Sequence, residues 1–533
     1  MCGARWNPEH RLFTFKGNDL HPDLVSYHAR PFSWGAHVER QLNKEEPPII
    51  IGKHTLTPRK DQLEGISMIQ EAYQQGSPGF LLADEMGLGK TLVAWDAINS
   101  IMPEGSRIAI VTPLSVIGNW VATLEDRGVN GQDVIILNYE KLRVFFDTSD
   151  VGKTKSGKSK ARTLKGVAKH GEIKSVDCLI FDESQKIKNN SSARAQLAFK
   201  LAKDAQFITW ISGTPGQNPL ELAYLLPILR YKTEGIKTGE CTAEELERWA
   251  AKQKLKLKRG AYGKWEWDQE GNEDKILADI LFNSKTKPRV AIHRVPSDII
   301  GWPEVQRILH PFELDDEEET QYKRSWEELR AAVLNTPVAT RSKAQSMAMV
   351  ALIRFRQKAS LIRVPKTVDL AEDILENGHQ VAISCEFLDT IRAFEEAFVK
   401  LKITTTTVTG AQQDPVLRQK AIDRFNKGEA QVILFTVTEG INLQENVILA
   451  KDKPRTQIDH DIRWSGLAMS QVDARCHRNG KYARVYWTYA KDTVEEDVIQ
   501  RVLLRLKGIE NIVGDDRQLA KEIEDQLISR AAK

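Results

Sequence analysis

The sequence predicts an α/β protein made of two doubly wound lobes that are separated by helices. Short apolar runs alternate with helical stretches between residues 56 and 230, and the same alternation returns beyond about residue 376. Short apolar runs bounded by polar or turn residues are typical of parallel strands that helices cover on both faces. A chain of 533 residues is also too long to fold around one core.

The predicted strands are short and apolar in both lobes. Those of the first lobe lie at Gly79–Ala83, Arg107–Thr112, Asp133–Leu137, Cys178–Phe181 and Phe207–Ile211. A helical stretch from about 315 to 375 precedes the second set, which is predicted at Gln380–Ser384, Thr404–Val408, Gln431–Phe435 and Arg484–Thr488. Helices from about Thr493 close the chain.

This pattern predicts five segments along the chain. They are an N-terminal accessory region, a first lobe, a helical linker or protrusion, a second lobe and a helical tail, at residues 1–50, 51–300, 301–375, 376–510 and 511–533. Two stretches interrupt the first lobe. Residues 151–175 hold eight Lys or Arg residues and one Glu among glycines and serines, which indicates a mobile basic loop. The insert at residues 236–275 joins a lysine run to Trp265 and Trp267.

Composition argues against several classes of protein. The net charge of +3 is small, so a surface for nucleic acid must come from local clusters of basic residues. The five cysteines show neither CxxC nor Cys/His ligand spacing, which argues against a zinc site or a disulfide framework and favours a reducing compartment. The sequence shows no run of 18 apolar residues and no secretion signal, so a cytosolic or nuclear protein is expected.

A phosphate-binding loop is predicted between the first strand and the helix that follows it. Its residues are Asp84, Glu85, Met86, Gly87, Leu88, Gly89, Lys90 and Thr91. Backbone N–H groups at a helix start attract anions, and glycines let the backbone approach phosphates closely. Lys90 is expected to reach the β- and γ-phosphates of ATP, and the Thr91 hydroxyl to bind Mg²⁺. Asp84 stands where such loops usually have their first glycine.

Two carboxylates follow the fourth predicted strand of the first lobe. Asp182 and Glu183 end the apolar run Cys178–Phe181, so they are expected at the carboxyl edge of the sheet, beside the phosphates. There Asp182 would hold Mg²⁺ through its water shell, and Glu183 would orient or deprotonate the attacking water. An Asp-Glu pair is a weak signal by itself, but its place about ninety residues after a phosphate loop makes it a strong one.

The order of these motifs resembles the Swi/Snf-like DNA translocases of helicase superfamily two, over residues 56–510. The resemblance implies two RecA-like lobes and an adenine-reading role for Gln62, and the DEMGLGKT of residues 84–91 is the form that this family prefers. It also implies DNA contacts in the first lobe at Thr112, Pro113, Asn119 and Trp120. A segment that links hydrolysis to movement is implied at Ser212, Gly213 and Thr214.

The second lobe carries the remaining motifs of the resemblance. Residues 436–443 (TVTEGINL) resemble a glycine-rich DNA-contact motif, which implies contacts by Thr438 and Asn442. Residues 471–478 (QVDARCHR) match the signature Q-x-x-x-R-x-H-R. By that match Gln471 belongs to the catalytic set, and Arg475 and Arg478 are arginine fingers directed at the γ-phosphate. Such a finger is typically worth roughly 10³–10⁵ in rate.

Three residues depart from the family's pattern. Gln185 replaces the usual histidine, and we expect this to weaken the coupling between hydrolysis and the segment at 212–214. Glu439 stands where a glycine is common, and Lys481 replaces a frequent glutamine. None of these changes removes a catalytic group, so an active ATPase is expected.

Together the motifs predict a motor that hydrolyses ATP with Mg²⁺ and moves along double-stranded DNA. The preference for double-stranded DNA is inferred from the family resemblance. Binding would be to the DNA phosphates and therefore without sequence specificity. The basic stretches 151–175 and 252–267 are hypothesised to hold DNA; an unchanged salt dependence of binding after deletion of 151–175 would exclude that role. The expected setting is the cytoplasm of a bacterium or a phage-infected host, without a membrane partner.

Two other functions stay open from the sequence. A strand-separating or annealing helicase shares every catalytic motif, and it would displace a strand from a fork more readily than a triplex strand from duplex. A non-moving ATP-dependent scaffold on DNA would turn over ATP slowly and without stimulation by DNA. A kinase or a small-molecule ATPase leaves the second lobe unexplained.

Overall fold

The computed structural model divides the chain into two compact units, Met1–Ile299 (unit 1) and Ile300–Lys533 (unit 2). The residues that the structure describes are 5–7, 12–14, 32–85, 87–146, 176–190, 192–213, 215, 219–237, 241–259, 265–267, 273–283, 285, 287–295, 298–300, 306–334, 341–412, 415–436, 441, 443, 454–464, 466–473, 475–476 and 483–509.

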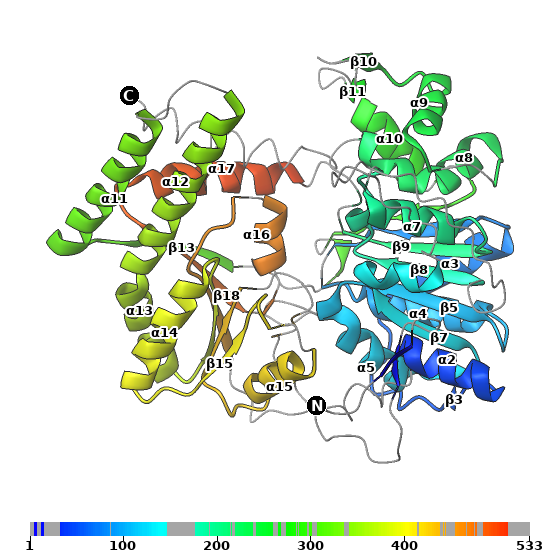
Figure 1. The fold of residues 1–533 in the computed structure, drawn as a ribbon, viewed down its shortest axis with the longest axis horizontal. Helices are drawn as coiled ribbons and strands as arrows, with labels where there is room; N and C mark the ends of the chain where they lie inside the picture. The colour runs from blue at the N-terminus through cyan, green and yellow to red at the C-terminus, as the bar shows by residue number, and fades with distance from the viewer. Residues whose placement is uncertain are drawn as a thin grey trace. The chain divides into compact units, whose positions relative to one another are not determined.

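Unit 1 is built on a six-stranded parallel sheet with the order β12-β4-β9-β8-β5-β7 (Figure 1). Its strands are β4 (Gly79–Leu82), β5 (Arg107–Thr112), β7 (Asp133–Asn138), β8 (Cys178–Asp182), β9 (Phe207–Ile211) and β12 (Ala291–Ile292). Because parallel strands end at the same edge of a sheet, the residues that follow β4, β5, β8 and β9 meet there.

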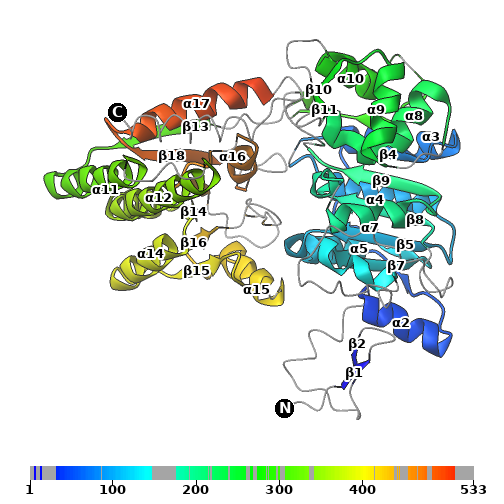
Figure 2. The ribbon, with the colours of Figure 1, turned by 45° about the horizontal axis from the view of Figure 1, so that its top comes forward.

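Helices cover both faces of this sheet (Figure 2). Successive strand residues alternate between two hydrophobic clusters, as Phe80 and Leu82 enter one and Leu81 the other. The first face is covered by α3 (Lys60–Gln74), α4 (Lys90–Ile101) and α5 (Ile117–Arg127). The second is covered by α7 (Ala193–Ala202), α8 (Leu226–Glu234), α9 (Ala243–Lys252) and α10 (Glu273–Phe282). Burial on both faces explains why the strands read as unbroken apolar runs.

Unit 2 contains a second six-stranded parallel sheet, with the order β13-β18-β17-β14-β16-β15. Its strands are β13 (Gln306–Phe312), β14 (Gln380–Ser384), β15 (Thr405–Val408), β16 (Val432–Phe435), β17 (Arg455–Asp459) and β18 (Arg484–Ala490). Together the two sheets confirm the predicted fold class, an α/β protein with two doubly wound lobes.

The helices of unit 2 pack on three hydrophobic clusters. One holds α13 (Val364–Glu376) and α14 (Leu388–Lys400), and another holds α15 (Pro415–Asn426) and the C-terminal part of α16 (Gly466–Asp473). The third joins β18 to α11 (Asp316–Leu334), α12 (Arg341–Ile362) and α17 (Val494–Ile509). The first two clusters take alternate residues of β14 and β16, so both faces of the central strands are buried.

Two strands of unit 2 differ from the sequence prediction. β13 lies within residues 301–375, where only a helical linker was expected, and it forms the edge of the sheet beside β18. It carries Pro311, which has no N–H to donate and is tolerated at an edge, so the segment does not read as a strand. β17 was missed because Arg455, Thr456, Gln457 and Asp459 are polar, although the strand is buried.

The described part of the N-terminal region comprises a short ladder, a helix and one further strand. β1 (Arg5–Asn7) pairs antiparallel with β2 (Leu12–Thr14), and β3 (Ile49–Ile50) pairs with β6 (Val129–Asn130). The helix α2 (Trp34–Asn43) is fixed to β7, because His37 Nδ1 and Arg40 Nη2 lie 2.6 and 2.5 Å from the Asp133 carboxylate. This helix therefore belongs to the body of unit 1.

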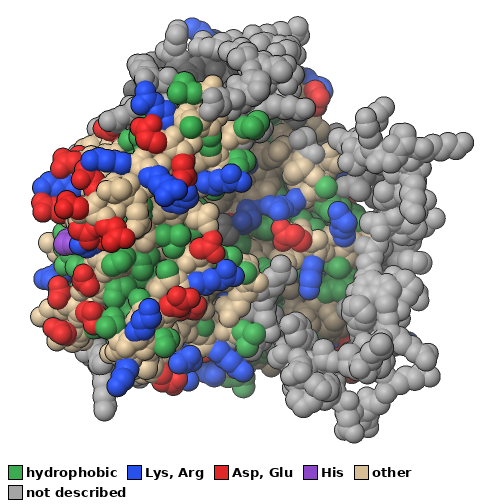
Figure 3. Space-filling view, turned by 60° about the vertical axis from the view of Figure 1, so that its left-hand side comes forward, with side chains coloured by type: hydrophobic (Ala, Val, Ile, Leu, Met, Phe, Trp, Pro, Cys, Tyr) green, Lys and Arg blue, Asp and Glu red, His purple; other side chains and the backbone are tan. Residues whose placement is uncertain are grey.

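The two inserts are described unequally. Within 236–275, β10 (Leu257–Arg259) pairs antiparallel with β11 (Trp265–Trp267), which places both tryptophans on a two-stranded ladder. The basic stretch 151–175 lies outside the described residues. On the face drawn in Figure 3, basic and acidic side chains are interspersed over most of the described surface. In the part of the chain that the structure describes, no helix is both long and apolar enough to cross a membrane.

Candidate functional site

The phosphate loop joins the end of β4 to the start of α4. Gly87 and Gly89 have φ angles of 86° and 82°, in the left-handed region that glycine enters at little cost. Gly89 is the N-cap of α4, and no side chain caps the first amides of this helix. A helix start without a side-chain acceptor is suited to binding an anion. This backbone therefore fits the phosphates of ATP. Met86 lies outside the described residues.

Gln62 holds the helix α3 against the phosphate loop. Its Nε2 donates to the carbonyl oxygen of Leu88 at 3.0 Å, and its Oε1 accepts from the backbone N–H of Arg59 at 2.9 Å. A Cβ at Gly89 would lie 2.3 Å from Gln62 Nε2. Glycine is therefore needed there both for its φ and for the approach of Gln62, which places the predicted adenine-reading residue beside the loop.

Arg294 explains why a carboxylate can stand at the first position of this loop. Its Nε and Nη2 donate to the two oxygens of Asp84 at 3.1 and 2.5 Å, and both side chains are buried. The same guanidinium donates to the carbonyl oxygen of Asp61 in α3. A Cβ at Gly65 would lie 3.0 Å from Arg294 Nη2, so this helical glycine makes room for the arginine. Sequence reasoning missed Arg294, because it lies 210 residues from Asp84.

Asp182 is held at the end of β8 by buried donors. Trp120 Nε1 and Thr112 Oγ1 donate to its Oδ2 at 2.8 and 3.1 Å, and the backbone N–H of Glu183 donates to its Oδ1 at 3.0 Å. Burial and then the neighbouring charge of Glu183 raise the pKa of Asp182 to about 6, against the donors and the charge of Lys90, which lower it. The carboxylate is thus fixed in direction and lies within the field of Lys90.

Thr112 and Trp120, for which DNA contacts are predicted, have their side chains inside unit 1. Both side chains are fully buried and donate to Asp182, which satisfies their polar groups inside the core. Pro113 is buried as well. Asn119 Nδ2 donates to Thr91 Oγ1 at 3.4 Å, so it contacts the predicted Mg²⁺ ligand. The segment supports the phosphate site with its side chains.

Lys90 and the residues after β9 lie at the same edge of the sheet. Lys90 Nζ donates to the carbonyl oxygen of Glu85 at 3.1 Å. A side chain at Gly213 would begin 3.8 Å from Lys90 Nζ and 3.4 Å from the carbonyl oxygen of Asp84. The backbone of Ser212 is fixed by a bond from its N–H to Leu82 O at 3.1 Å. Ser212 and Gly213 therefore lie beside the phosphate loop. Thr214 lies outside the described residues.

Glu183 is connected to Ser212 through Gln185. Gln185 Nε2 donates to Glu183 Oε2 at 2.7 Å, and Ser212 Oγ donates to Gln185 Oε1 at 2.7 Å. Glu183 itself has a φ of 53°, a left-handed conformation that costs roughly 1–2 kcal/mol for a residue with a Cβ. Such strain persists where surrounding contacts fix the residue, and it is frequent at functional sites. The glutamine that departs from the family pattern thus forms a direct link.

In unit 2, Arg475, one of the two predicted arginine fingers, is bonded to backbone carbonyl oxygens of its own unit. The side chain is buried, with Nε donating to Gln471 O at 2.7 Å and Nη1 to Ile441 O at 3.1 Å. Its guanidinium therefore fixes the segment at Ile441 to α16, which carries the buried Gln471. Arg478, Thr438 and Asn442 lie outside the described residues.

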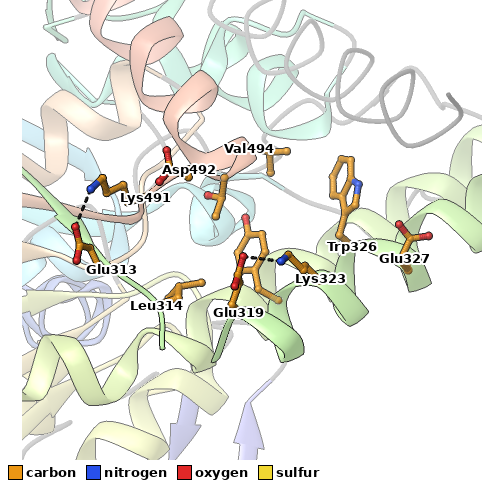
Figure 4. A pocket seen from close by; sticks show the side chains of 11 residues that line it. Glu313, Leu314, Glu319, Lys323, Trp326, Glu327, Lys491, Asp492 and Val494 are labelled. Atoms are coloured by element: carbon orange, nitrogen blue, oxygen red, sulfur yellow. Dashed lines mark hydrogen bonds and ion pairs between the residues drawn. The ribbon is translucent and has the colours of Figure 1, made fainter. Parts of the chain in front are cut away.

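A pocket of about 470 Å³ lies elsewhere in unit 2, between α11 and the turn from β18 into α17 (Figure 4). The side chain of Trp326 lines it, and two ion pairs, Lys491–Glu313 at 2.7 Å and Lys323–Glu319 at 2.6 Å, lie along it. The residues that line this pocket include none of the predicted site residues.

A phosphate loop after β4, a carboxylate pair at the end of β8 and two doubly wound units are the features of a nucleotide-hydrolysing protein of the two-lobed α/β class. The family model described as SNF2-related domain matches residues 61–359, which is more than half of the chain. The chain therefore belongs to the SNF2-related family, ATPases of the Swi/Snf group in helicase superfamily two.

Several known proteins are similar to this chain. Chromodomain-helicase-DNA-binding protein 9 of Homo sapiens is 25% identical over 529 aligned residues, which cover 89% of this chain and 17% of that protein. Chromodomain-helicase-DNA-binding protein 6 of Mus musculus is 26% identical, with 88% and 18% covered. The chain thus spans less than a fifth of these relatives. The solved Sulfolobus solfataricus SWI2/SNF2 ATPase core in complex with dsDNA is 18% identical, with a TM-score of 0.35, and 90% of this chain and 98% of that chain are covered.

Proposed function

We propose that this protein is a DNA-dependent ATPase that hydrolyses ATP to move along double-stranded DNA. The observation that carries the proposal is the chain of hydrogen bonds from Glu183 through Gln185 to Ser212, at the sheet edge that also holds Lys90 and Asp182. A hydrolytic carboxylate that is bonded to a neighbouring loop can pass a change at the nucleotide to the rest of the lobe.

The side chains of unit 1 divide the work of hydrolysis. ATP, when bound, supplies the phosphoanhydride bond that is hydrolysed and the negative charge of its phosphates. Lys90 and the first amides of α4 would bind its phosphates, while Thr91 and Asp182 would hold Mg²⁺, the latter through water. Glu183 would orient or deprotonate the attacking water, and Gln62 would read the adenine.

Unit 2 would complete the site when it closes on the nucleotide. In this proposal Arg478 is the arginine finger, because the guanidinium of Arg475 is already bonded to the carbonyl oxygens of Ile441 and Gln471. Arg475 would act indirectly, by holding the segment that carries Thr438 and Asn442 on α16. Each cycle of closure and release would then change the grip of the second lobe on DNA.

DNA is the proposed partner, bound through its phosphates. The names of the relatives describe DNA-binding helicases, which supports a nucleic-acid substrate. The eight Lys and Arg residues in 151–175, accompanied by one Glu, are candidate phosphate contacts, since a chain with a net charge of only +3 needs a local cluster of basic residues to attract DNA.

The test is ATP turnover with no DNA, single strands, duplex and forked DNA, for the wild type and for Lys90→Ala. We expect duplex to stimulate turnover most, and Lys90→Ala to abolish it with every substrate, because the variant lacks the charge that binds the phosphates. Turnover that depends on Lys90 but shows no preference among nucleic acids would reject the proposal. A larger response to forks than to duplex would instead favour a strand-separating helicase.

A further inference from the structure

Two separate hydrogen-bond chains join the turn after β8 to the segment after β9. The first runs from Glu183 through Gln185 to Ser212. The second runs from Ser184, whose Oγ lies 3.4 Å from the hydroxyl of Tyr224, and on from that hydroxyl to the carbonyl oxygen of Pro215 at 2.6 Å. The two chains therefore reach the two ends of the segment 212–215.

The first chain has a fixed direction. An ionised carboxylate only accepts hydrogen bonds, so Gln185 must turn its NH₂ group to Glu183. Its carbonyl oxygen then faces Ser212, whose hydroxyl has to donate. Glutamine does not titrate, whereas a histidine in this position would change its charge near neutral pH. Gln185 itself therefore contributes no titrating group to the link.

The second chain is enclosed in the core of unit 1. Tyr224 lies in η4 (Pro219–Leu225) with its side chain 1% exposed, and Ser184 is fully buried. Burial raises the pKa of the Tyr224 phenol, so the hydroxyl stays protonated and keeps its proton for Pro215. The hydroxyls of Ser184 and Tyr224 are buried and the carbonyl of Pro215 is part-buried, so a hydroxyl that loses its partner here is left unsatisfied.

We infer that Tyr224 is a positioning residue for hydrolysis, which holds the segment 212–215 and the strained turn at Glu183 as one body. Gln185 fixes the start of the segment at Ser212, and Tyr224 fixes its end at Pro215. The turn is fixed at consecutive residues, since Ser184 and Gln185 directly follow Glu183, whose φ is 53°. The inference rests on the proposed hydrolytic role of Glu183 and adds a residue to it.

The test is Tyr224→Phe, which removes one hydroxyl and keeps the packed ring. We expect kcat for ATP to fall about tenfold, while KM for ATP stays within about twofold, because the phosphate loop keeps its own contacts. Tyr231→Phe is the matched control, since Tyr231 in α8 donates to the carbonyl oxygen of Gln75 at 2.7 Å. We expect this control to retain the kcat and KM of the wild type. Any change that it does show measures the general effect of losing a tyrosine hydroxyl.

A second variant tests the route to the turn. If Tyr224 acts through Ser184, Ser184→Ala combined with Tyr224→Phe lowers kcat no further than Tyr224→Phe alone. If Tyr224→Phe does not fold, Ser184→Ala alone is measured instead. Its kcat for ATP is expected to fall while its KM for ATP stays constant.

Unchanged kcat in Tyr224→Phe, or equal losses of kcat and thermal stability in both tyrosine variants, would overturn the inference. Every rate is measured both without DNA and with duplex. A wild type that hydrolyses ATP but ignores DNA contradicts the proposed translocase, yet the comparison of kcat between variants still decides the role of Tyr224.

Discussion

Asp182, the carboxylate proposed to hold Mg²⁺, is oriented by donors from a neighbouring strand and a helix. Its Oδ2 accepts from Thr112 and Trp120, which come from the end of β5 and from α5. Donors directed at a buried carboxylate favour its charged form, and they oppose the burial that raises its pKa to about 6. The polar residues at the end of β5 therefore serve Asp182.

This role of β5 predicts the behaviour of Thr112→Val, which keeps the shape and removes the hydroxyl. We expect kcat/KM for ATP to fall roughly five- to thirtyfold, because losing a hydrogen bond to a buried charged group typically costs about 1–2 kcal/mol. The affinity for duplex DNA, measured without nucleotide by fluorescence anisotropy, is expected to stay the same. Weaker DNA binding with normal ATP hydrolysis would instead restore the DNA-contact role for this residue.

Residues of the site differ in how far the sequence alone reveals them. The phosphate loop and the pair Asp182-Glu183 each consist of consecutive residues. Their chemistry depends on the local order of residue types, so the sequence alone reveals them. Arg294 and Tyr224 have no local signal, because the fold brings them to Asp84 and Pro215 from 210 and 9 residues away. Thr112 and Trp120 were placed by resemblance in the right segment, but a resemblance does not give the direction of a side chain.

At the scale of elements, β17 shows how polar contacts can stabilise a buried strand that the sequence does not reveal. In β17, Arg455 Nη1 donates to the carbonyl oxygen of Leu443 and Gln457 Nε2 to that of Val472, both at 2.7–2.8 Å. Hydrophobic periodicity cannot detect a buried strand whose side chains are polar and satisfied. By contrast, the apolar strands β5, β9 and β14 lie at the predicted residues.

The end of β17 carries a histidine that makes the stability of unit 2 depend on pH. His460 is fully buried, with Nε2 facing Ser360 O at 2.9 Å and Nδ1 facing Thr367 Oγ1 at 2.8 Å. Burial and then the charge of Arg363 lower its pKa to about 4, against the opposing charge of Asp461. Arg363 in turn is paired with Asp461 and with Glu495 of α17. His460 is thus neutral when the unit is folded.

The sign of the pH effect follows from this neutral state. In the unfolded chain His460 takes up a proton as the pH falls through 6.5, whereas in the folded chain it does so only near pH 4. The free energy of unfolding therefore decreases as the pH falls between these two values. At pH 5.0 the loss relative to pH 7.5 is about 2 kcal/mol. It is measured by hydrogen exchange of the β14 and β17 amides, corrected for intrinsic rates.

His460→Gln is the comparison for that measurement. It retains a donor toward Ser360 O but does not titrate, so the variant is expected to lose about 2 kcal/mol less than the wild type between the two pH values. Equal losses in both proteins would show that His460 does not control this dependence, whatever the absolute stability of the variant.

For the whole molecule, the two units divide the motifs between them. Unit 1 contains the phosphate loop, Asp182, Glu183 and the segment at Ser212, while unit 2 contains Gln471 and Arg475. In the proposed mechanism the hydrolytic groups are complete only when the two units meet, which would link turnover to relative motion if both units hold DNA. The proposal of movement along duplex depends on this division.

Displacement of a third strand from a triplex on duplex DNA tests that proposal most directly. The wild type is expected to displace the triplex strand in an ATP-dependent reaction and to leave the underlying duplex intact, whereas Lys90→Ala displaces nothing. Tyr231→Phe, which alters unit 1 away from the site, is expected to match the wild type. Rapid DNA-stimulated ATP hydrolysis without any triplex displacement would contradict the account, because the ATPase would then act on DNA without moving along it.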